Sequence, residues 1–402
     1  MAVYSYKARD PLNNKVVRST IQADSEAAAA KLLMAQHLVP IHIAKVEEGA
    51  FLSRFSNHVT KKELVVMTRQ LSTMLNAGLP LSQSLSTVAG QTSGHALKNM
   101  LSDVLNNING GASLADSLAK YPDTFNTFFV SIVRAGEASG KLDTSLERLA
   151  NQLEHDADML SKIRGAMVYP AIVLVVIVSV VIYMLVTLVP QVRILYEDMH
   201  KTLPFQTLIL QAVADFTTHY WYITLLILLG AGVTINRWKK TQSGKRTFDA
   251  LKLNAPLFSP LVRKLYMARF SRTMQTLVQS GVSIIESLQI SADSVSNLLV
   301  RDDILAAIGP VKNGKAVSEA LSDKDYIMPF VPQMLKIGES SGSIDNMLGK
   351  IADYYDKEVD NAIKSISTLI EPILMVIMAL LIGFIVVSVL LPIYQLSTSI
   401  QR

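Results

Sequence analysis

The sequence predicts an all-α polytopic membrane protein with a duplicated helical domain and a small α/β module at its N-terminus. Three observations support this fold class. Half of the 402 residues are hydrophobic, and the most apolar ones are concentrated in a few long runs without charged residues. A polar helical unit followed by such a run occurs twice along the chain. The first 50 residues instead contain polar–apolar alternation of the kind found in strands.

The duplication is clearest in a ten-residue motif. Residues 134–143 read Arg-Ala-Gly-Glu-Ala-Ser-Gly-Lys-Leu-Asp, and residues 336–345 read Lys-Ile-Gly-Glu-Ser-Ser-Gly-Ser-Ile-Asp. The two copies are separated by a constant offset (338 − 136 = 202). The shared positions are Gly136, Glu137, Ser139, Gly140 and Asp143, matched by Gly338, Glu339, Ser341, Gly342 and Asp345. Because a missed repeat misassigns the whole fold, this match decides the domain plan.

Further matches extend the repeat on both sides of the motif. Upstream, Gly78 and Gly281 follow matching helical segments, and glycine commonly ends a helix. Downstream, Pro170 and Pro372 stand at the same place, at the start of an apolar run. The repeated unit is therefore a polar helical domain joined to one membrane span.

These boundaries predict two homologous cytoplasmic helical bundles, at residues 61–165 and 264–367. After the first motif, apolar residues continue at helical spacing without a strong breaker, so one helix is expected from about residue 143 to 189. Such a helix is on the order of 70 Å long. Asp143 and Asp345 are expected at or near the start of the two long helices.

Three runs are long enough to cross a bilayer, which takes roughly 20 apolar residues. They are predicted at residues 168–190, 216–236 and 370–392. The middle run contains His219, and a buried helical hairpin is the alternative interpretation of this run. Glu371 is an ionisable residue at the edge of the last run, where it is either functional or reaches out to the membrane surface.

Basic residues predict the orientation, because Lys and Arg near span ends mark the cytoplasmic side. Five of them lie between Arg237 and Arg246, directly after the second run, whereas residues 191–215 contain two. The N-terminus is therefore predicted inside the cell, and residues 191–215 and the C-terminus outside. No cleavable signal peptide is recognisable at the N-terminus.

No catalytic, cofactor or metal site is predicted. The segment from Gly136 to Gly140 superficially suggests a phosphate-binding loop, but three residues separate the glycines instead of four, and Leu142 replaces the magnesium-binding Ser or Thr. A tight break between helices at 136–140 is the favoured interpretation. Glu154 and Asp158 share a helical face that could hold a hard cation weakly, although a solvated face is favoured. Cysteine is absent, which excludes disulfides and thiolate metal sites.

Residues 1–50 are predicted to form the small α/β module. Strand-like alternation occurs at residues 3–8, 15–22 and 39–46, and good helix formers occupy residues 27–36. A docking role is expected for the module, without an indication of the partner. The net charge of +5 is spread along the chain without a dense basic block, so nucleic acid is not an expected partner.

Two helical domains with the pattern Gly-Glu-x-Ser-Gly-x-[Leu/Ile]-Asp, each joined to a span that begins at a proline, resemble the inner-membrane platform family of type II secretion and type IV pilus machines. The resemblance covers essentially the whole chain. It implies a non-enzymatic protein of the bacterial inner membrane. The N-terminus is then expected in the cytoplasm, and residues 191–215 and the C-terminus are expected in the periplasm. The implied partners are the cytoplasmic assembly ATPase, pilin or pseudopilin subunits, accessory inner-membrane assembly proteins, membrane lipid and further copies of the chain.

A small-solute membrane transporter built from repeated units is the alternative function, since repeated spans occur in transporters. Against it, the predicted spans contain few polar residues, and most of the duplicated mass is cytosolic. Uptake assays would identify a transporter, and ATPase assays on the purified protein would identify an enzyme. The choice between a type II secretion system and a type IV pilus is left open by the sequence.

Overall fold

The computed structural model describes residues 2–9, 16–23, 39–45, 59–198, 205–256 and 258–400, together with Ala28, Ala30 and Met34. The chain divides into two compact units. One contains Met1–Thr60 and Thr92–Asn99, and the other contains Lys61–Gln91 and Met100–Arg402.

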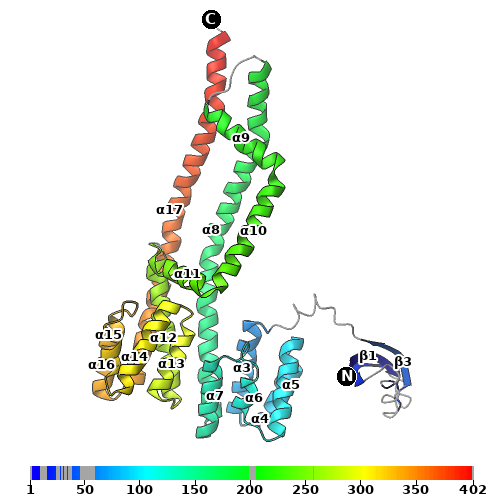
Figure 1. Cartoon of the computed structure of the whole chain (residues 1–402), viewed down its shortest axis with the longest axis vertical. Helices are drawn as coiled ribbons and strands as arrows, with labels where there is room; N and C mark the ends of the chain where they lie inside the picture. The colour runs from blue at the N-terminus through cyan, green and yellow to red at the C-terminus, as the bar shows by residue number, and fades with distance from the viewer. Residues whose placement is uncertain are drawn as a thin grey trace. The chain divides into compact units, whose positions relative to one another are not determined.

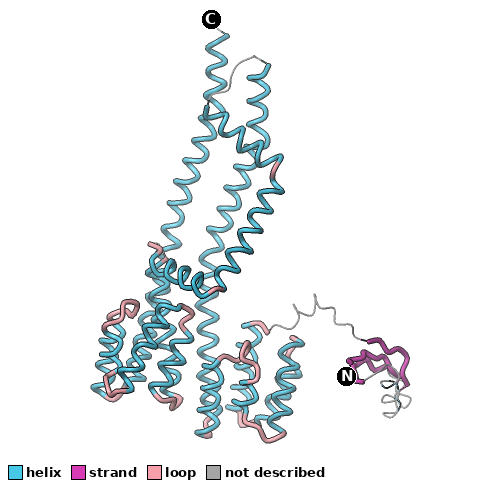
Figure 2. The backbone as a smooth tube through the Cα atoms, viewed as in Figure 1, coloured by secondary structure: helices cyan, strands magenta, loops and turns pink. Residues whose placement is uncertain are grey.

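The first unit contains a three-stranded antiparallel sheet (Figure 2). Its strands are β1 (Ala2–Arg9), β2 (Val16–Ala23) and β3 (Val39–Lys45). β1 is central, so that Tyr6 is paired with Ser19 on one side and Ile43 on the other. The three predicted strands are thus present. The predicted helix at 27–36 lies mostly outside the described residues, of which Ala28, Ala30 and Met34 are helical.

The rest of the described chain forms helices, most of them in two matching series (Figures 1 and 2). The first series is α3 (Lys61–Asn76), α4 (Leu81–Gln91), α5 (His95–Asn109), α6 (Leu114–Ala119), α7 (Thr127–Ser139) and α8 (Leu142–Asp198). The second is α12 (Ser259–Gln279), α13 (Ile284–Ser294), α14 (Leu298–Lys312), α15 (Val317–Ser322), α16 (Phe330–Ser341) and α17 (Ile344–Ile400). Both series place a six-residue helix fourth and a 57-residue helix last, as expected for a duplication.

Three helices connect the two series. They are α9 (Phe205–His219), α10 (Trp221–Lys240) and α11 (Gln242–Asn254). The middle run was predicted at residues 216–236, but the structure has two helices there, because α9 ends and α10 begins on either side of Tyr220. The start predicted for this run is therefore wrong, because residues 216–219 belong to the preceding helix.

The two series bury equivalent apolar positions. Leu85 and Leu288 are both fully buried, as are Leu146 and Leu348 at the start of the long helices. In the first series, aromatic residues contribute to the core: Phe125 is buried, with its ring centroid 5.0 Å from that of Phe129. The turns match as well, because Gly78 and Gly281 both adopt a left-handed backbone that glycine reaches without steric cost.

The long helices α8 and α17 are continuous through the predicted domain boundaries at residues 165 and 367. Pro170 and Pro372 lie inside these helices, at the start of the apolar runs, so the helix expected to continue through Pro170 is present. Proline at position 170 removes one backbone hydrogen bond from α8, and neighbouring bonds sustain the helix. α8 also continues beyond the predicted end at residue 189, to Asp198.

Within the described residues, two helices are long and apolar enough to cross a membrane, over Leu142–Gln191 of α8 and Ile344–Ser388 of α17. Of the most apolar 18 residues in each, only 17% in α8 and 6% in α17 are buried within the protein. The core helix of a soluble protein would be mostly covered by protein. The exposed apolar surface of α8 and α17 therefore fits contact with lipid.

Candidate functional site

The repeated motif forms the turns between α7 and α8 and between α16 and α17. Gly140 and Gly342 end their helices with φ of +69° and +66°. The Lys141 N–H then donates to the Gly136 carbonyl at 2.9 Å, and the Ser343 N–H donates to the Gly338 carbonyl at 2.9 Å. This pattern is a Schellman motif, which requires a left-handed residue after the helix.

The helix break is shorter than the sequence suggested. The break was predicted over residues 136–140, whereas α7 continues through Gly136 to Ser139. Gly136 has a packing role instead. A Cβ added at this position would lie 2.7 Å from the Cβ and Oγ of Ser145 on α8. At Gly338 the corresponding Cβ would lie 3.0 Å from the Ile344 Cα. Both glycines therefore permit close packing of the short helix on the long one.

The glutamate of each motif holds a second helix in place. Glu137 accepts from the backbone N–H groups of Leu114 at 2.6 Å and Ala115 at 2.9 Å, at the start of α6. Glu339 accepts from the Val317 N–H at 2.5 Å and the Ser318 N–H at 3.2 Å, at the start of α15. The first backbone N–H groups of a helix lack partners within the helix, and a carboxylate satisfies them while favouring the helix dipole.

The motif serines are bonded to their own helices. Ser139 Oγ donates to the Ala135 carbonyl at 2.8 Å, and Ser341 Oγ donates to the Ile337 carbonyl at 2.9 Å. Together with the two glutamates, these contacts give the polar groups of the motif structural tasks, so the arrangement supports the helix-turn interpretation over a phosphate-binding loop. Asp143 and Asp345 lie in the first turns of α8 and α17, as predicted.

A second repeated contact joins the first helix of each series to its long helix. Arg69 on α3 forms an ion pair with Glu154 on α8 and donates to Asn151 Oδ1 at 2.6 Å. Arg272 on α12 contacts Asp356 and Asp353 on α17, each at 2.6 Å. The partners match across the repeat (356 − 154 = 202 and 353 − 151 = 202). An arginine is thus fixed against the long helix at the same place in both copies.

The two long helices also contact each other on the polar side of their apolar segments. His155 Nε2 on α8 lies 3.1 Å from Asp356 Oδ2 on α17, as an ion-pair contact. A second pair lies further along both helices. Lys162, two turns beyond His155 on α8, pairs with Asp360, one turn beyond Asp356 on α17, at 2.9 Å. The apolar residues between these pairs form a cluster that includes Met159 of α8 and Val359 of α17. The charged contacts and this cluster hold α8 and α17 together.

The electrostatics of this cross-helix contact favour charged forms of both partners. Contact with Asp356 raises the pKa of His155, and the nearby Asp156 acts in the same direction, while burial and Arg272 oppose them. Burial disfavours the ionised form of Asp356, but contacts with His155 and Arg272 outweigh it and lower its pKa. Asp156 differs, since burial raises its pKa. The contact therefore favours protonation of His155 and ionisation of Asp356 relative to the two groups apart.

The remaining predicted site residues are not brought into one site. Glu154 is paired with Arg69, and 40% of its side chain remains exposed. Among the described residues, no group of three or more His, Asp or Glu side chains is placed to hold a metal ion, Glu154 and Asp158 included. Glu371 is exposed on α17.

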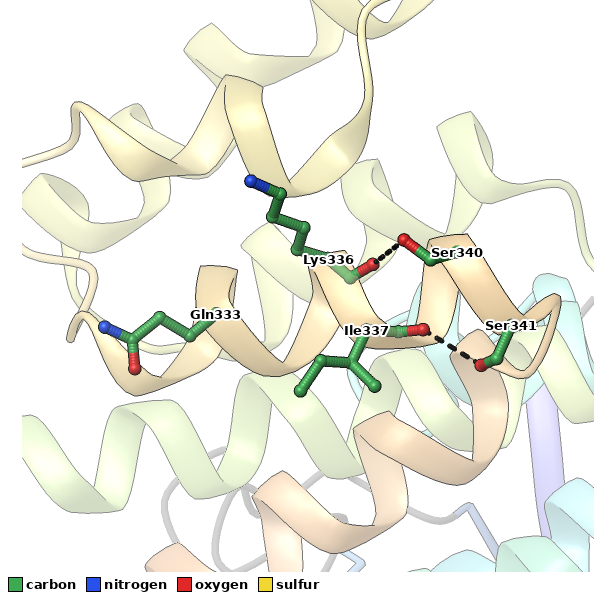
Figure 3. Close-up of a pocket in the computed structure, with 5 residues that line it drawn as sticks. All are labelled: Gln333, Lys336, Ile337, Ser340 and Ser341. Carbon is green, nitrogen blue, oxygen red and sulfur yellow. Dashed lines mark hydrogen bonds between the residues drawn. The ribbon is translucent and has the colours of Figure 1, made fainter.

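A depression of about 430 Å³ lies along α16 (Figure 3). Its lining residues come from this one helix: Gln333, Lys336, Ile337, Ser340 and Ser341. Figure 3 shows both serine hydroxyls bonded to carbonyl groups of the same helix. Since no acid–base or nucleophile–base pair lines it, the depression does not resemble an active site.

Comparison with known proteins decides the family. The sequence profile of the family described as "Type II secretion system (T2SS), protein F" matches residues 67–190 and again 270–392. These two regions are the two helical series with their apolar segments. The chain belongs to this protein F family. The profile described as "Type II secretion system protein F, N-terminal domain" also matches residues 1–44, which contain the three-stranded sheet.

Relatives in the protein F family span this chain almost completely. The type IV pilus assembly protein PilC of Thermus thermophilus is 36% identical over 98% of this chain and 98% of its own length. PilC of Myxococcus xanthus is 33% identical, covering 94% of this chain and 91% of its own length. The type II secretion system protein F of Vibrio cholerae is 32% identical over the full length of both chains. The predicted family is therefore confirmed.

The arginine contacts and the cross-helix pairs were missed by reasoning from sequence. For the arginines, a signal existed. Arg69 and Arg272 occupy matching positions in the two protein F repeats, and so do Glu154 and Asp356. An acidic residue preserved opposite a preserved arginine indicates an ion pair. The contact of His155 with Asp356 has no such signal, because His155 is matched by Lys357 in the second repeat.

Proposed function

We propose that this protein is a platform of the bacterial inner membrane that helps to assemble a type IV pilus or a type II secretion pseudopilus. In this role it couples a cytoplasmic assembly ATPase to the extraction of pilin or pseudopilin subunits from the membrane. Accessory inner-membrane assembly proteins, membrane lipid and further copies of the chain are its other partners. The names of its relatives, which are type IV pilus assembly and type II secretion proteins, support this assignment.

The observation that carries the coupling proposal is the continuity of α8 and α17. Each is a single 57-residue helix that begins at the repeated motif and includes a whole apolar segment. At 1.5 Å per residue, each helix is about 85 Å long, of which the hydrocarbon core of a bilayer accounts for about 30 Å. A displacement at the polar end of such a helix is therefore transmitted to the membrane.

The contacts at the polar end support a joint response of both helices. The glycine of each motif allows α7 or α16 to pack closely on the long helix, and the glutamate joins that short helix to α6 or α15. The arginines join the long helix to α3 or α12. The pairs of His155 with Asp356 and Lys162 with Asp360 then join α8 to α17. A push on either helical series is thus shared between the two apolar segments.

The proposed topology has three spans, from α8, α10 and α17. α10 carries Arg237, Lys239 and Lys240 in its last turn, which supports a cytoplasmic position for this end. Both helical series and the N-terminal module are then cytoplasmic, whereas residues 191–215 and the C-terminus are periplasmic. The module at 1–50, proposed as α/β, serves as a docking element.

The proposed platform is not an enzyme and obtains its energy from the ATPase. The polar side chains of the motif are used within the fold, since Glu137 and Glu339 bind helix N-termini. We expect the purified protein to hydrolyse no ATP by itself and to bind the assembly ATPase through one or both cytoplasmic helical domains.

The coupling is tested by inserting two glycines after Gly165, which lies in α8 between the cross-helix contacts and Pro170. The glycine insertion makes the helix flexible there, since glycine is the poorest helix former apart from proline. Pull-down of the ATPase should be unchanged, and pilus or pseudopilus assembly should be lost.

Insertion of two alanines at the same place is the matched control. It shifts the register of α8 by the same amount but keeps the helix stiff, so some assembly should remain. Normal assembly by the glycine variant would refute transmission through a rigid α8. Equal loss in both variants would assign the effect to register instead of stiffness.

A further inference from the structure

The helix α9 has an exposed apolar face that its position between two predicted spans does not explain. Phe205 is 73% exposed, Leu208 49%, Ile209 43% and Phe216 48%. These residues fall on one side of the helix, because spacings of three, four, seven and eleven residues return to the same face. The polar residues Gln211 and Asp215 form a polar edge that borders this face beside Leu208.

The opposite side of α9 is packed against α8. Ala214 is buried in a cluster with Leu185 and Val189 of α8. Counted from Pro170, Leu185 is 15 residues along the helix (185 − 170 = 15), which corresponds to about 22 Å at 1.5 Å per residue. The hydrocarbon core is about 30 Å thick, so this contact lies at the depth of the outer part of the bilayer.

A charged pair between α8 and α9 is a second indication of the depth of α9 in the membrane. Arg193, one turn beyond Val189 on α8, pairs with Asp215 of α9 at 3.9 Å. Charged side chains are stable at the level of the lipid headgroups and costly in the hydrocarbon core. The polar edge of α9 therefore faces the headgroups, while its apolar face is level with the exposed apolar surface of α8.

We propose that α9 is embedded in the outer leaflet of the membrane, with lipid acyl chains covering Phe205, Leu208, Ile209 and Phe216. A helix that carries an apolar face, a polar edge and aromatic residues at its end is typical of interfacial membrane helices. The proposal rests on the topology proposed above and refines it, because α9 is then not a segment immersed in the periplasm.

The absence of cysteine from the chain allows a direct test. Single cysteines replace Leu208 or Phe216 on the apolar face, and Gln211 on the polar edge serves as the matched control. Val176, exposed on the apolar segment of α8, is the reference for lipid contact. The full-length protein is spin-labelled at each cysteine and reconstituted into vesicles of phosphatidylethanolamine and phosphatidylglycerol.

Collision with molecular oxygen, which concentrates in lipid, is then compared with collision with the water-soluble nickel ethylenediaminediacetate. The Leu208→Cys and Phe216→Cys proteins should resemble Val176→Cys, with an oxygen-to-nickel ratio several-fold higher than that of Gln211→Cys. A high nickel accessibility at all three α9 positions would overturn the proposal. Exclusion of both reagents from positions 208 and 216 would also overturn it, because protein and not lipid would then cover the face.

Failure of the topology gives a different result. In cells with a permeabilised outer membrane, a membrane-impermeant maleimide should modify the Gln211→Cys protein from the periplasmic side. Modification only in inside-out vesicles would refute the proposed topology, whereas the collision pattern would still report whether α9 is embedded in lipid.

Discussion

Gly136 packs where the short helix α7 approaches α8 most closely, and an added methyl group has no room there. Its Cβ would lie 2.7 Å from Ser145 Cβ, nearer than two carbon atoms approach without displacement. The Gly136→Ala substitution should therefore lower the free energy of unfolding by about 1–3 kcal/mol, the usual cost of overpacking. Heat or denaturant unfolding of the purified protein in detergent measures this change.

Gly90 in α4 provides the matched control in the same helical series, because an added Cβ there meets nothing within 4 Å. Gly90→Ala should leave stability unchanged or raise it by up to about 1 kcal/mol, the difference in helix propensity. Equal stability of the Gly136→Ala and wild-type proteins would contradict the close-packing role of Gly136.

Glu137 and Glu339 act on the short helices α6 and α15 through their carboxylates. Glu137→Ala leaves the N–H groups of Leu114 and Ala115 without this acceptor, so stability should fall by about 0.5–2 kcal/mol, as for loss of other helix caps. Glu137→Gln keeps one acceptor oxygen but no charge, and should lose less. Because the two sites lie in separate repeats, the losses of Glu137→Ala and Glu339→Ala should add in the double variant.

An effect of Glu137→Gln as large as that of Glu137→Ala would mean that charge, and not hydrogen bonding, accounts for the stabilisation. No effect of either substitution would refute the capping role itself. The same unfolding measurement distinguishes these results.

At the residue level, the sequence predicted which positions form the motif but not the structural role of each one. It predicted a tight break between helices at 136–140, and the structure shows close packing at Gly136 and a left-handed conformation at Gly140. The function of Glu137 was not predictable, because its partners on α6 lie 22 and 23 residues away in sequence. Helical periodicity describes contacts within one helix and not between helices.

At the level of elements, the contact of α8 with α17 should depend on pH. The folded-state pKa of His155 lies above its ordinary value of about 6.5, chiefly because of Asp356. A group whose pKa is raised by folding stabilises the fold fully below its unfolded pKa, and this contribution disappears as pH rises through the folded pKa. Asp356 remains ionised in this range, since its pKa is lowered.

The stability difference between the wild-type protein and the His155→Gln variant should therefore be largest near pH 6 and should shrink as the pH is raised above the folded pKa of His155. Thermal unfolding across pH 5.5–9 measures the difference, at about 0.15 M ionic strength because partly exposed pairs are screened by salt. Lys162→Gln serves as a control, because it removes the other ion pair between α8 and α17 and leaves the contact of His155 with Asp356 in place. A difference that is constant with pH would contradict the ion pair.

The helices themselves were largely predictable, and their ends less so. Apolar periodicity and repeated glycines predicted two helical bundles and the long helix after the first motif, because these signals are local. The helix expected to run through Pro170 is present as α8, and α17 likewise continues through Pro372. A long helix tolerates the loss of one hydrogen bond when its neighbours remain, which periodicity alone does not reveal. The break at Tyr220 lacks a Gly or Pro signal and was missed for this reason.

At the scale of the whole molecule, the positive charges near the spans determine the proposed orientation. The last turn of α10 carries Arg237, Lys239 and Lys240, and α11 adds Lys245 and Arg246. The described part of the opposite connection contains one basic residue, Arg193, which is paired with Asp215. Because Lys and Arg near span ends are retained in the cytoplasm, α10 should enter the cytoplasm at Arg237.

Reporter fusions test this orientation. Alkaline phosphatase, active only outside the cytoplasm, should be active when fused after Met199 and inactive after Lys245 and Asp345; a fluorescent protein that folds in the cytoplasm should give the opposite pattern. Replacing Arg237, Lys239 and Lys240 together by Gln should weaken this pattern, since three of the five clustered positive charges are then lost. A matched replacement of Lys312, Lys315 and Lys324, which lie far from any span, should leave it unchanged. Fluorescence of the fusion after residue 199, together with inactive alkaline phosphatase there, would reverse the proposed topology. Both helical series would then lie on the side opposite to the ATPase.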